Sequence, residues 1–178
     1  MRYTGQTRNK GFTLIELMVT VAVMALLLTV GAPAMGSFLQ NSQLDSTVDQ
    51  LKNIYSFTRQ EAVHRQQVVS LCAFDTQNNT CGNSWNDGAL VYIDRDGAAG
   101  FGGTDLRLRE VEFTEGVTVV WTGSENRLDL EADGSTDDAA QFTISVQGMD
   151  GGIDMDISLI GRARITESEE KKSSELSS

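Results

Sequence analysis

The stretch KGFTLIELMV, residues 10–19, decides the first element of the fold, because a basic leader meets an apolar run there. The leader, residues 1–11, carries Arg2, Arg8 and Lys10 and no acid. The apolar run continues from Phe12 to Met35 and is interrupted by few polar side chains. About 20 apolar residues in a helix span a bilayer. We therefore expect a transmembrane helix over residues 12–35.

The charges on either side of this run predict its orientation. Every charged residue before it is basic, and the first charged residue after Glu16 is Asp45. Positive flanks stay in the cytoplasm. We expect a single-pass protein of the bacterial inner membrane, with a cytoplasmic N-terminus and a periplasmic C-terminal domain.

Glu16 is the unusual residue of the apolar run. A carboxylate inside a membrane-length segment is costly, so it indicates a function. Thr13 precedes it by three residues, which also fits a local capping box, and the two roles are compatible. A cleaved secretory signal ending near residues 32–34 would have a shorter apolar core. A plain signal anchor leaves Glu16 unexplained.

Pro33 is expected to break or kink the helix near the end of the apolar run, because proline removes a backbone hydrogen bond. Beyond Gly36 the pattern becomes amphipathic, which predicts a helix to about residues 64–66 with one face on a sheet. The apolar positions of that face are Leu44, Val48, Leu51, Tyr55, Ala62 and Val63. His64 is expected to be a solvated residue at the helix end, without catalytic partners.

The remainder reads as about seven short strands separated by Gly, Asn and Asp. The expected strands cover residues 68–74, 89–93, 106–113, 117–122, 128–130, 141–146 and 153–160. The fold class is therefore α+β: a long N-terminal helix, with a transmembrane half and an amphipathic half, packed on an antiparallel β-sandwich-like head domain. We divide the chain into a leader (1–11), a membrane helix (12–35), an amphipathic helix (36–66), a β-rich domain (67–165) and a tail expected to be disordered (166–178).

Charge and cysteine content restrict the partners and the compartment. The chain of 178 residues has a net charge of −11, which falls to −14 without the three basic leader residues. Such a surface repels nucleic acid at long range. Cys72 and Cys81 follow the membrane segment and are expected to pair in an oxidising compartment, although two free thiols are the alternative. With His64 they do not supply four zinc ligands, so no metal site is expected.

The motif GFTLIEL, residues 11–17, resembles the processing site of type IV prepilins and type II secretion pseudopilins. The resemblance implies that a prepilin peptidase cuts between Gly11 and Phe12 and that Phe12 becomes N-methylated. Glu16 then becomes the fifth mature residue. In that family it pairs with the amino-terminal charge of a neighbouring subunit, which is consistent with the need to pair a buried charge.

Further motifs resemble the GspH/FimT group of minor pseudopilins and minor pilins. They are V-x-L-C at residues 69–72, W-x-x-G at 85–88, V-Y-I-D at 91–94 and G-R-A-R at 161–164. The resemblance implies a non-enzymatic subunit without a cofactor, in a type II secretion pseudopilus or a type IV pilus. Its expected place is the tip complex that primes polymerisation. Its expected partners are the prepilin peptidase, other major and minor subunits, the inner-membrane assembly platform and the membrane.

Arg162 and Arg164 are the candidate contact for DNA or a partner. In a strand they would point to one face and could grip phosphates. FimT-like members with this ending are associated with DNA uptake, so a DNA-binding minor pilin is the alternative function. The acidic stretch 167–170 and the net charge disfavour it, and salt bridges or a subunit contact are the competing roles.

The acids of residues 94–105 suggest calcium only weakly. Asp94, Asp96 and Asp105 supply oxygen atoms, but the positions between Asp96 and Asp105 lack the side-chain ligands that a calcium loop needs. We expect a turn with solvated acids there.

Overall fold

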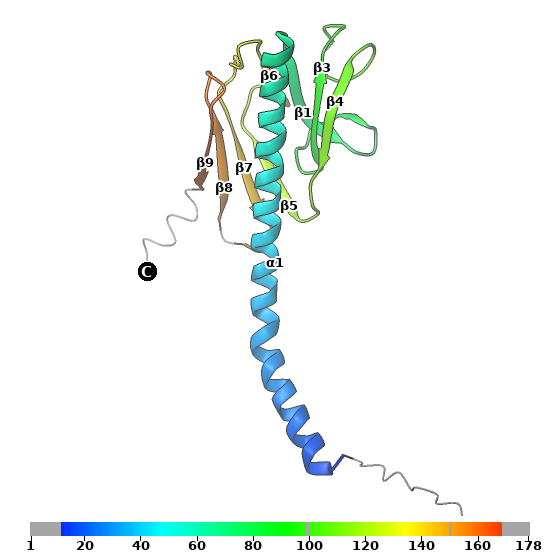
Figure 1. Cartoon of the computed structure of the whole chain (residues 1–178), viewed down its shortest axis with the longest axis vertical. Helices are drawn as coiled ribbons and strands as arrows, with labels where there is room; N and C mark the ends of the chain where they lie inside the picture. Colours follow the sequence, from blue (N-terminus) through cyan, green and yellow to red (C-terminus); the bar gives the residue numbers. More distant parts are fainter. Residues whose placement is uncertain (1–11, 99, 150, 169–178) are drawn as a thin grey trace, which may run out of the picture. The chain divides into compact units, whose positions relative to one another are not determined.

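The computed structural model describes residues 12–98, 100–149 and 151–168, without the side chains of residues 28–34. It contains one long helix and nine strands within these ranges (Figure 1). The chain divides into two compact units, Met1–Phe38 and Leu39–Ser178. Each unit is described by itself below.

The helix α1 is a single element, Leu14–Arg65. The predicted break at Pro33 is therefore wrong as far as the helical backbone is concerned. A proline removes one hydrogen bond of the ladder, while the turns on either side retain theirs, so a long helix can continue through it. The expected end at residues 64–66 is confirmed, since Arg65 is the last helical residue.

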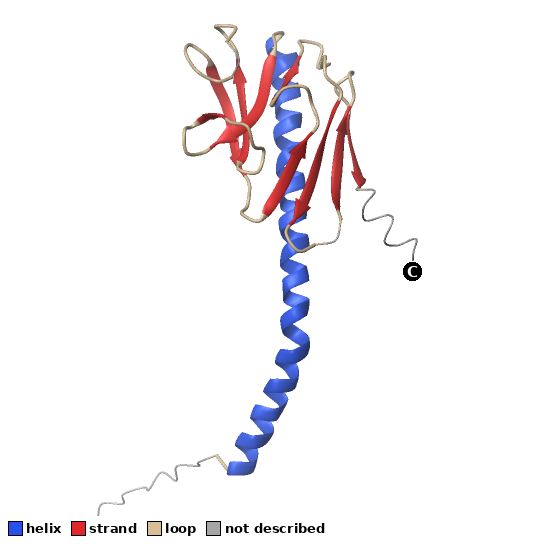
Figure 2. Ribbon diagram, turned by 180° about the vertical axis from the view of Figure 1, so that it is seen from behind, coloured by secondary structure: helices blue, strands red, loops and turns tan. Residues whose placement is uncertain are grey.

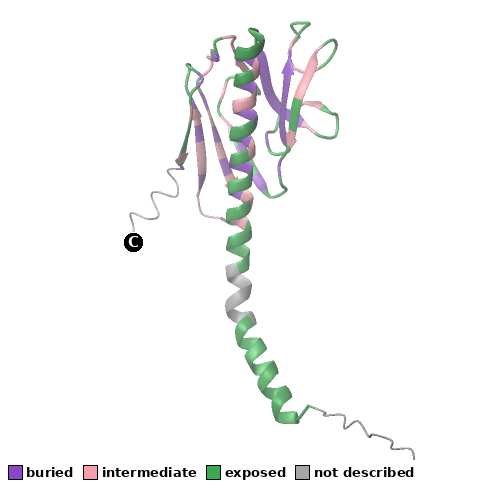
Figure 3. Ribbon diagram, in the orientation of Figure 1, coloured by how far each residue is buried: buried purple, intermediate pink, exposed green. Residues whose placement is uncertain are grey.

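In the first unit the described residues of α1 are exposed (Figure 3), and most of them are apolar. Leu14, Leu17 and Leu26, for example, are 77%, 60% and 70% exposed. The expected membrane segment 12–35 includes residues 28–34, whose side chains lie outside the described part of the chain. A search of the described residues finds no helix with a stretch long and apolar enough to cross a membrane.

In the second unit α1 buries one face. The buried positions recur every three or four residues, which places them on one side of a helix. They are Leu44, Thr47, Val48, Leu51, Ile54, Tyr55, Thr58 and Ala62. The predicted face is confirmed except for Val63, which is 42% exposed.

The strands form two antiparallel sheets (Figure 2). The five-stranded sheet has the order β2-β1-β3-β4, and β6 also pairs with β1. Its strands are β1 (Val69–Asp75), β2 (Thr80–Cys81), β3 (Gly88–Ile93), β4 (Leu106–Glu112) and β6 (Arg127–Leu130). The four-stranded sheet has the order β5-β7-β8-β9. Its strands are β5 (Val117–Trp121), β7 (Ala140–Val146), β8 (Gly152–Ile157) and β9 (Ala163–Glu167).

One apolar core joins both sheets to α1. It contains the buried helix face, the central strands β1 and β3, and the alternating residues Phe142, Ile144 and Val146 of β7. Trp85 lies against Phe142 edge to face, with ring centroids 4.8 Å apart. The predicted fold, a helix on an antiparallel two-sheet domain, is confirmed.

Three strand predictions need correction. The strand β2 was missed because its two residues carry no periodicity. The expected strand 153–160 ends at Ile157, because a turn follows in which Ser158 N–H donates to Arg162 O. The chain then returns as β9, which was not predicted and which pairs Thr166 with Asp154.

The tail begins later than expected. Thr166 and Glu167 belong to β9, and Ser168 is buried, where its N–H donates to Gly152 O. The backbone pairing with β8 therefore extends the sheet beyond residue 165. The rest of the predicted tail, residues 169–178, lies outside the described residues.

Candidate functional site

The first predicted site is the start of α1. Gly11, on the leader side of the expected cleavage point, lies outside the described residues. Phe12 is the first described residue, and its side chain is 82% exposed. The bond between them thus borders the helix, one residue before its N-terminal cap at Thr13.

Thr13 and Glu16 form the capping box that the spacing predicted. Glu16 N–H lies 3.3 Å from Thr13 Oγ1, and Thr13 N–H lies 3.4 Å from Glu16 Oε2. These long contacts satisfy two backbone donors at the helix start. They hold the carboxylate near the N-terminal end of α1 but leave it exposed, so it remains accessible to a positive charge from another molecule.

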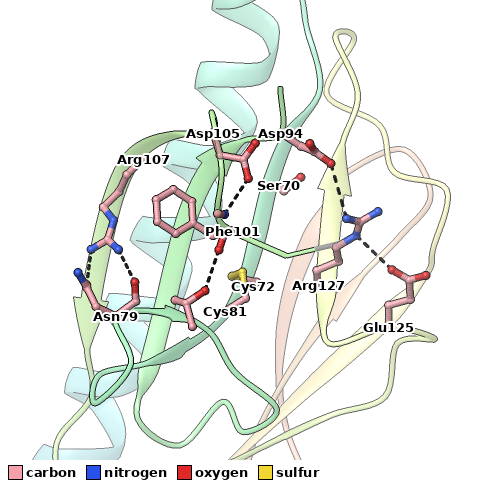
Figure 4. Close-up of a disulfide and its surroundings, with 12 residues drawn as sticks. Ser70, Cys72, Asn79, Cys81, Asp94, Phe101, Asp105, Arg107, Glu125 and Arg127 are labelled. Atoms are coloured by element: carbon pink, nitrogen blue, oxygen red, sulfur yellow. Dashed lines mark hydrogen bonds and ion pairs between the residues drawn. A yellow bond between two sulfur atoms is a disulfide. The ribbon is translucent and has the colours of Figure 1, made fainter. Parts of the chain in front are cut away.

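The disulfide between Cys72 and Cys81 is present and joins β1 to β2 (Figure 4). It lies beside a second, smaller apolar cluster of Phe74, Leu90 and Tyr92. Phe101 packs on this cluster from the β3–β4 loop, and its carbonyl accepts a 2.7 Å hydrogen bond from Thr80 Oγ1. The disulfide therefore belongs to the outer side of the five-stranded sheet, where it fixes the short β2 hairpin beneath that loop.

The acidic residues of the β3–β4 loop come together. Carboxylate oxygens of Asp94, Asp96 and Asp105 lie within 4.8 Å of one another. Backbone N–H groups already engage each of them, for example Arg95 N–H on Asp105 at 2.8 Å. Burial raises the pKa of Asp105, but the N–H groups of Arg95 and Gly102 outweigh it and hold the pKa below its usual value. The carboxylates thus accept hydrogen bonds from backbone N–H groups of the loop.

Arg162 and Arg164 are both exposed, but they do not share a strand. β9 begins at Ala163, so Arg162 lies in the preceding turn, where its N–H donates to Ser158 Oγ at 3.2 Å. Arg164 lies within β9 opposite Asp156. Arg162 precedes the strand and Arg164 belongs to it, so the shared strand face considered for the two side chains does not apply.

Sequence reasoning missed a groove of about 810 Å³ between α1 and β9. We call it the α1–β9 groove. Its main lining residues are Tyr55, Arg59, Val63, Ile160, Arg162 and Ile165. The exposed position of Val63 on an otherwise buried helix face belongs to it. In the sequence, the signal that could have indicated the groove is the apolar pair Leu159 and Ile160, which precedes the turn at Gly161.

Gly161 fixes one wall of the groove. Its φ of 68° lies in the left-handed region, and a Cβ atom there would come within 1.8 Å of Gly134 O. Tyr55 Oη donates to Gly161 O at 2.9 Å, and Arg59 Nε donates to Gly134 O at 3.0 Å. Burial raises the pKa of Tyr55 and outweighs the opposing effect of the Arg59 charge. The phenol therefore stays protonated and can donate this hydrogen bond. The glycine of the G-R-A-R motif is thus required by backbone packing.

Comparisons with known proteins agree with this architecture. The family described as "Type II transport protein GspH" matches residues 47–161, and the prokaryotic N-terminal methylation motif matches residues 6–32. A comparison with curated proteins gives no match.

Two crystal structures of the type IV minor pilin FimU of Pseudomonas aeruginosa strain PAO1 resemble the chain. One has a TM-score of 0.59 at 20% identity and covers 75% of this chain and 98% of FimU. The other has a TM-score of 0.56 at 20% identity and covers 72% and 99%. At this identity the likeness shows a shared pilin-like fold.

The family match covers more than half of the chain, and the methylation motif coincides with the basic leader and the apolar start of α1. Together they imply processing by a prepilin peptidase, anchoring in the inner membrane and assembly with other pilins. The chain belongs to the GspH family, and it is a non-enzymatic minor pseudopilin or minor pilin of a type II secretion system or a type IV pilus.

Proposed function

We propose that this subunit works in the tip complex that primes polymerisation of its filament, on the inner-membrane assembly platform. The observation that carries the proposal is the exposed apolar surface of α1 from Leu14 to Leu27, which contains a single carboxylate, Glu16. Exposed apolar surface of this extent marks a contact with lipid or with other proteins. Helices of neighbouring subunits provide that contact in a filament.

Glu16 gives the contact a register. After cleavage between Gly11 and Phe12, the new amino group lies four residues before Glu16. A carboxylate surrounded by apolar helices is stabilised when a positive charge reaches it, and the amino terminus of an adjacent subunit supplies one. The capping box with Thr13 holds Glu16 near the start of α1 and therefore positions it for that contact.

The head domain makes the subunit distinct from its neighbours. Its helix face is buried under two sheets, so the outer faces of the sheets and their edges remain for partners.

An in-frame deletion tests the proposal, scored in the same cultures for surface pili and for released exoproteins. If the subunit primes polymerisation, the deletion strain should form far fewer filaments, and each of these should have normal length. Complementation should restore their number. Unchanged filament number with shorter filaments would contradict a role in priming.

The same cultures identify the machine. Loss of exoprotein release with normal pili indicates a secretion pseudopilus, and the reverse indicates a type IV pilus. DNA uptake by Arg162 and Arg164 stays a prediction, but the structure gives it little support. Arg162 lies in a turn, and Arg164 is opposite Asp156.

A further inference from the structure

We infer that the α1–β9 groove binds an extended, acidic segment of a neighbouring subunit, which adds as a strand to the outer edge of β9. The inference rests on the proposed function for the identity of the partner. The juxtaposition that carries it is an exposed apolar groove, a basic rim and the edge strand of the four-stranded sheet at one place.

The sheet edge comes from the order β5-β7-β8-β9. β9 pairs with β8 on one side and has no strand partner on the other side among the described residues. Such an edge presents backbone donors and acceptors in a row, and an extended peptide can continue the ladder. The alternation of β9 places Ala163 and Ile165 toward the groove and Arg164 on the opposite face.

The groove itself is apolar enough to hold side chains of such a segment. Val63, Ile160 and Ile165 are 42%, 70% and 39% exposed, although they lie next to the buried core. A strand beside β9 would direct alternate residues into the groove and the others toward the Arg164 side. The lining that the first set meets is both apolar and basic, so a segment that brings apolar and acidic residues into the groove matches it.

The charge of the groove selects the partner. Lys52, Arg59, His64 and Arg162 line it, and the described lining contains no carboxylate. This basic rim lies on a chain whose net charge is −11. No ion pair joins Lys52, Arg59 or Arg162 to an acid within the described residues. Complementary charge therefore favours an acidic segment over a basic one.

A peptide fits this surface better than DNA does. Bases and phosphates would leave the backbone groups of β9 unpaired. A long polyanion would also extend beyond the groove onto the acidic surface, which repels it. A short segment stays within the basic rim.

The test uses the full-length chain in detergent micelles and fluorescence anisotropy. The probe is a labelled peptide in which Glu-Glu-Val-Val repeats, so that each of its faces carries both residue types. It is about eight residues long, which is enough to cover β9. We expect saturable binding that weakens with salt, and at least about tenfold weaker binding by the variant Arg162→Glu. Arg95→Glu is the matched control, because Arg95 is exposed and does not line the groove. It should bind the peptide as the unmodified chain does.

Two further probes separate the parts of the proposal. A Lys–Val peptide of the same length tests charge and should not bind. Two peptides N-methylated at alternate amides, one in each phase, test edge pairing, and one phase should lose binding. Near-ultraviolet circular dichroism of each variant confirms that its head is folded.

The proposal is overturned if the Glu–Val and Lys–Val peptides bind alike, if both N-methylated peptides bind normally, or if Arg162→Glu has no effect. Binding of a DNA duplex that Arg162→Glu abolishes, without peptide binding, would make the groove a nucleic-acid site. These outcomes do not depend on filament counts. A failed groove and a failed priming role are therefore distinguishable.

Discussion

The two ends of α1 belong to one helix but differ in the burial of their side chains. From Leu14 to Leu27 the described side chains are exposed and almost uniformly apolar, and no face is distinguished. From Leu44 to Ala62 apolar residues return every three or four positions, and that face is buried under two sheets. Propensity makes both segments helical, and among the described residues the second segment packs on the two sheets.

The difference shows where the stability of each end comes from. The buried face contributes to folding of the head, because its side chains leave water when the head forms. The almost uniformly apolar end shows no such burial among the described residues, and the family match implies membrane anchoring and assembly with other pilins for it. One helix thus carries a folding determinant and an assembly determinant that can be changed separately.

The largest expected effect is a matched pair of leucine truncations. Leu51→Ala removes a fully buried side chain and should lower the unfolding free energy of the head by about 2–5 kcal/mol. Leu17→Ala removes an exposed one and should change it by less than about 0.5 kcal/mol. Urea unfolding followed by near-ultraviolet circular dichroism measures both. Equal destabilisation by the two variants would refute the division of α1.

The next effect concerns the head alone. Replacing both Cys72 and Cys81 by serine removes the disulfide, which closes a short loop. The unfolding free energy should fall by about 2–3 kcal/mol in the chain-entropy model. Adding a reductant to the unmodified protein should reproduce the loss, whereas the double variant should not respond to it.

A smaller effect tests how the buried end of α1 is tied to the sheet turn. Tyr55→Phe removes the hydroxyl that donates to Gly161 O and retains the ring. We expect a loss of about 0.5–1.5 kcal/mol, the usual net value of a hydrogen bond. The control Tyr3→Phe lies in the leader and should have no effect on unfolding. A loss from Tyr3→Phe as large as that from Tyr55→Phe would show that the measurement does not report on the head.

The smallest effect is the acid dependence of the head. Hydrogen bonds from Asn78 lower the pKa of Asp75, and those from Ser124 lower the pKa of Asp138. The folded state therefore holds these carboxylates charged to lower pH than the unfolded chain does. Their contribution is present above their usual pKa of about 4 and is lost as the pH falls below it. Asp138→Asn should flatten the slope of unfolding free energy against pH, and an unchanged slope would contradict this origin.

The fold could be predicted from local patterns wherever those patterns were long. The helix face at Leu44, Val48, Leu51 and Tyr55 follows from the periodicity of apolar residues. The strands β1 and β3 follow from runs of mostly apolar residues, which the structure buries. The strand β2 has two residues, too few for any period, and only its disulfide marks it. Where local signals are short, pairing with distant residues decides the structure.

The site was predictable only where a motif carried it. Glu16, its capping partner and the cleavage point follow from residues 11–17. The α1–β9 groove joins residues about a hundred positions apart, and no pattern in either segment reports their approach. Gly161 was part of a recognised motif, but its close contact with Gly134 becomes visible only in three dimensions.

The role of Glu16 in assembly is tested most directly by comparing Glu16→Ala with Asp45→Ala, its nearest acidic neighbour along the chain. Immunoblots should show normal size reduction of both variants in membranes. Sheared filaments should contain Asp45→Ala at the normal level and Glu16→Ala at a small fraction of it, because its amino-terminal charge partner is left unpaired. Filaments that contain Glu16→Ala at the normal level would contradict the assembly role of this carboxylate.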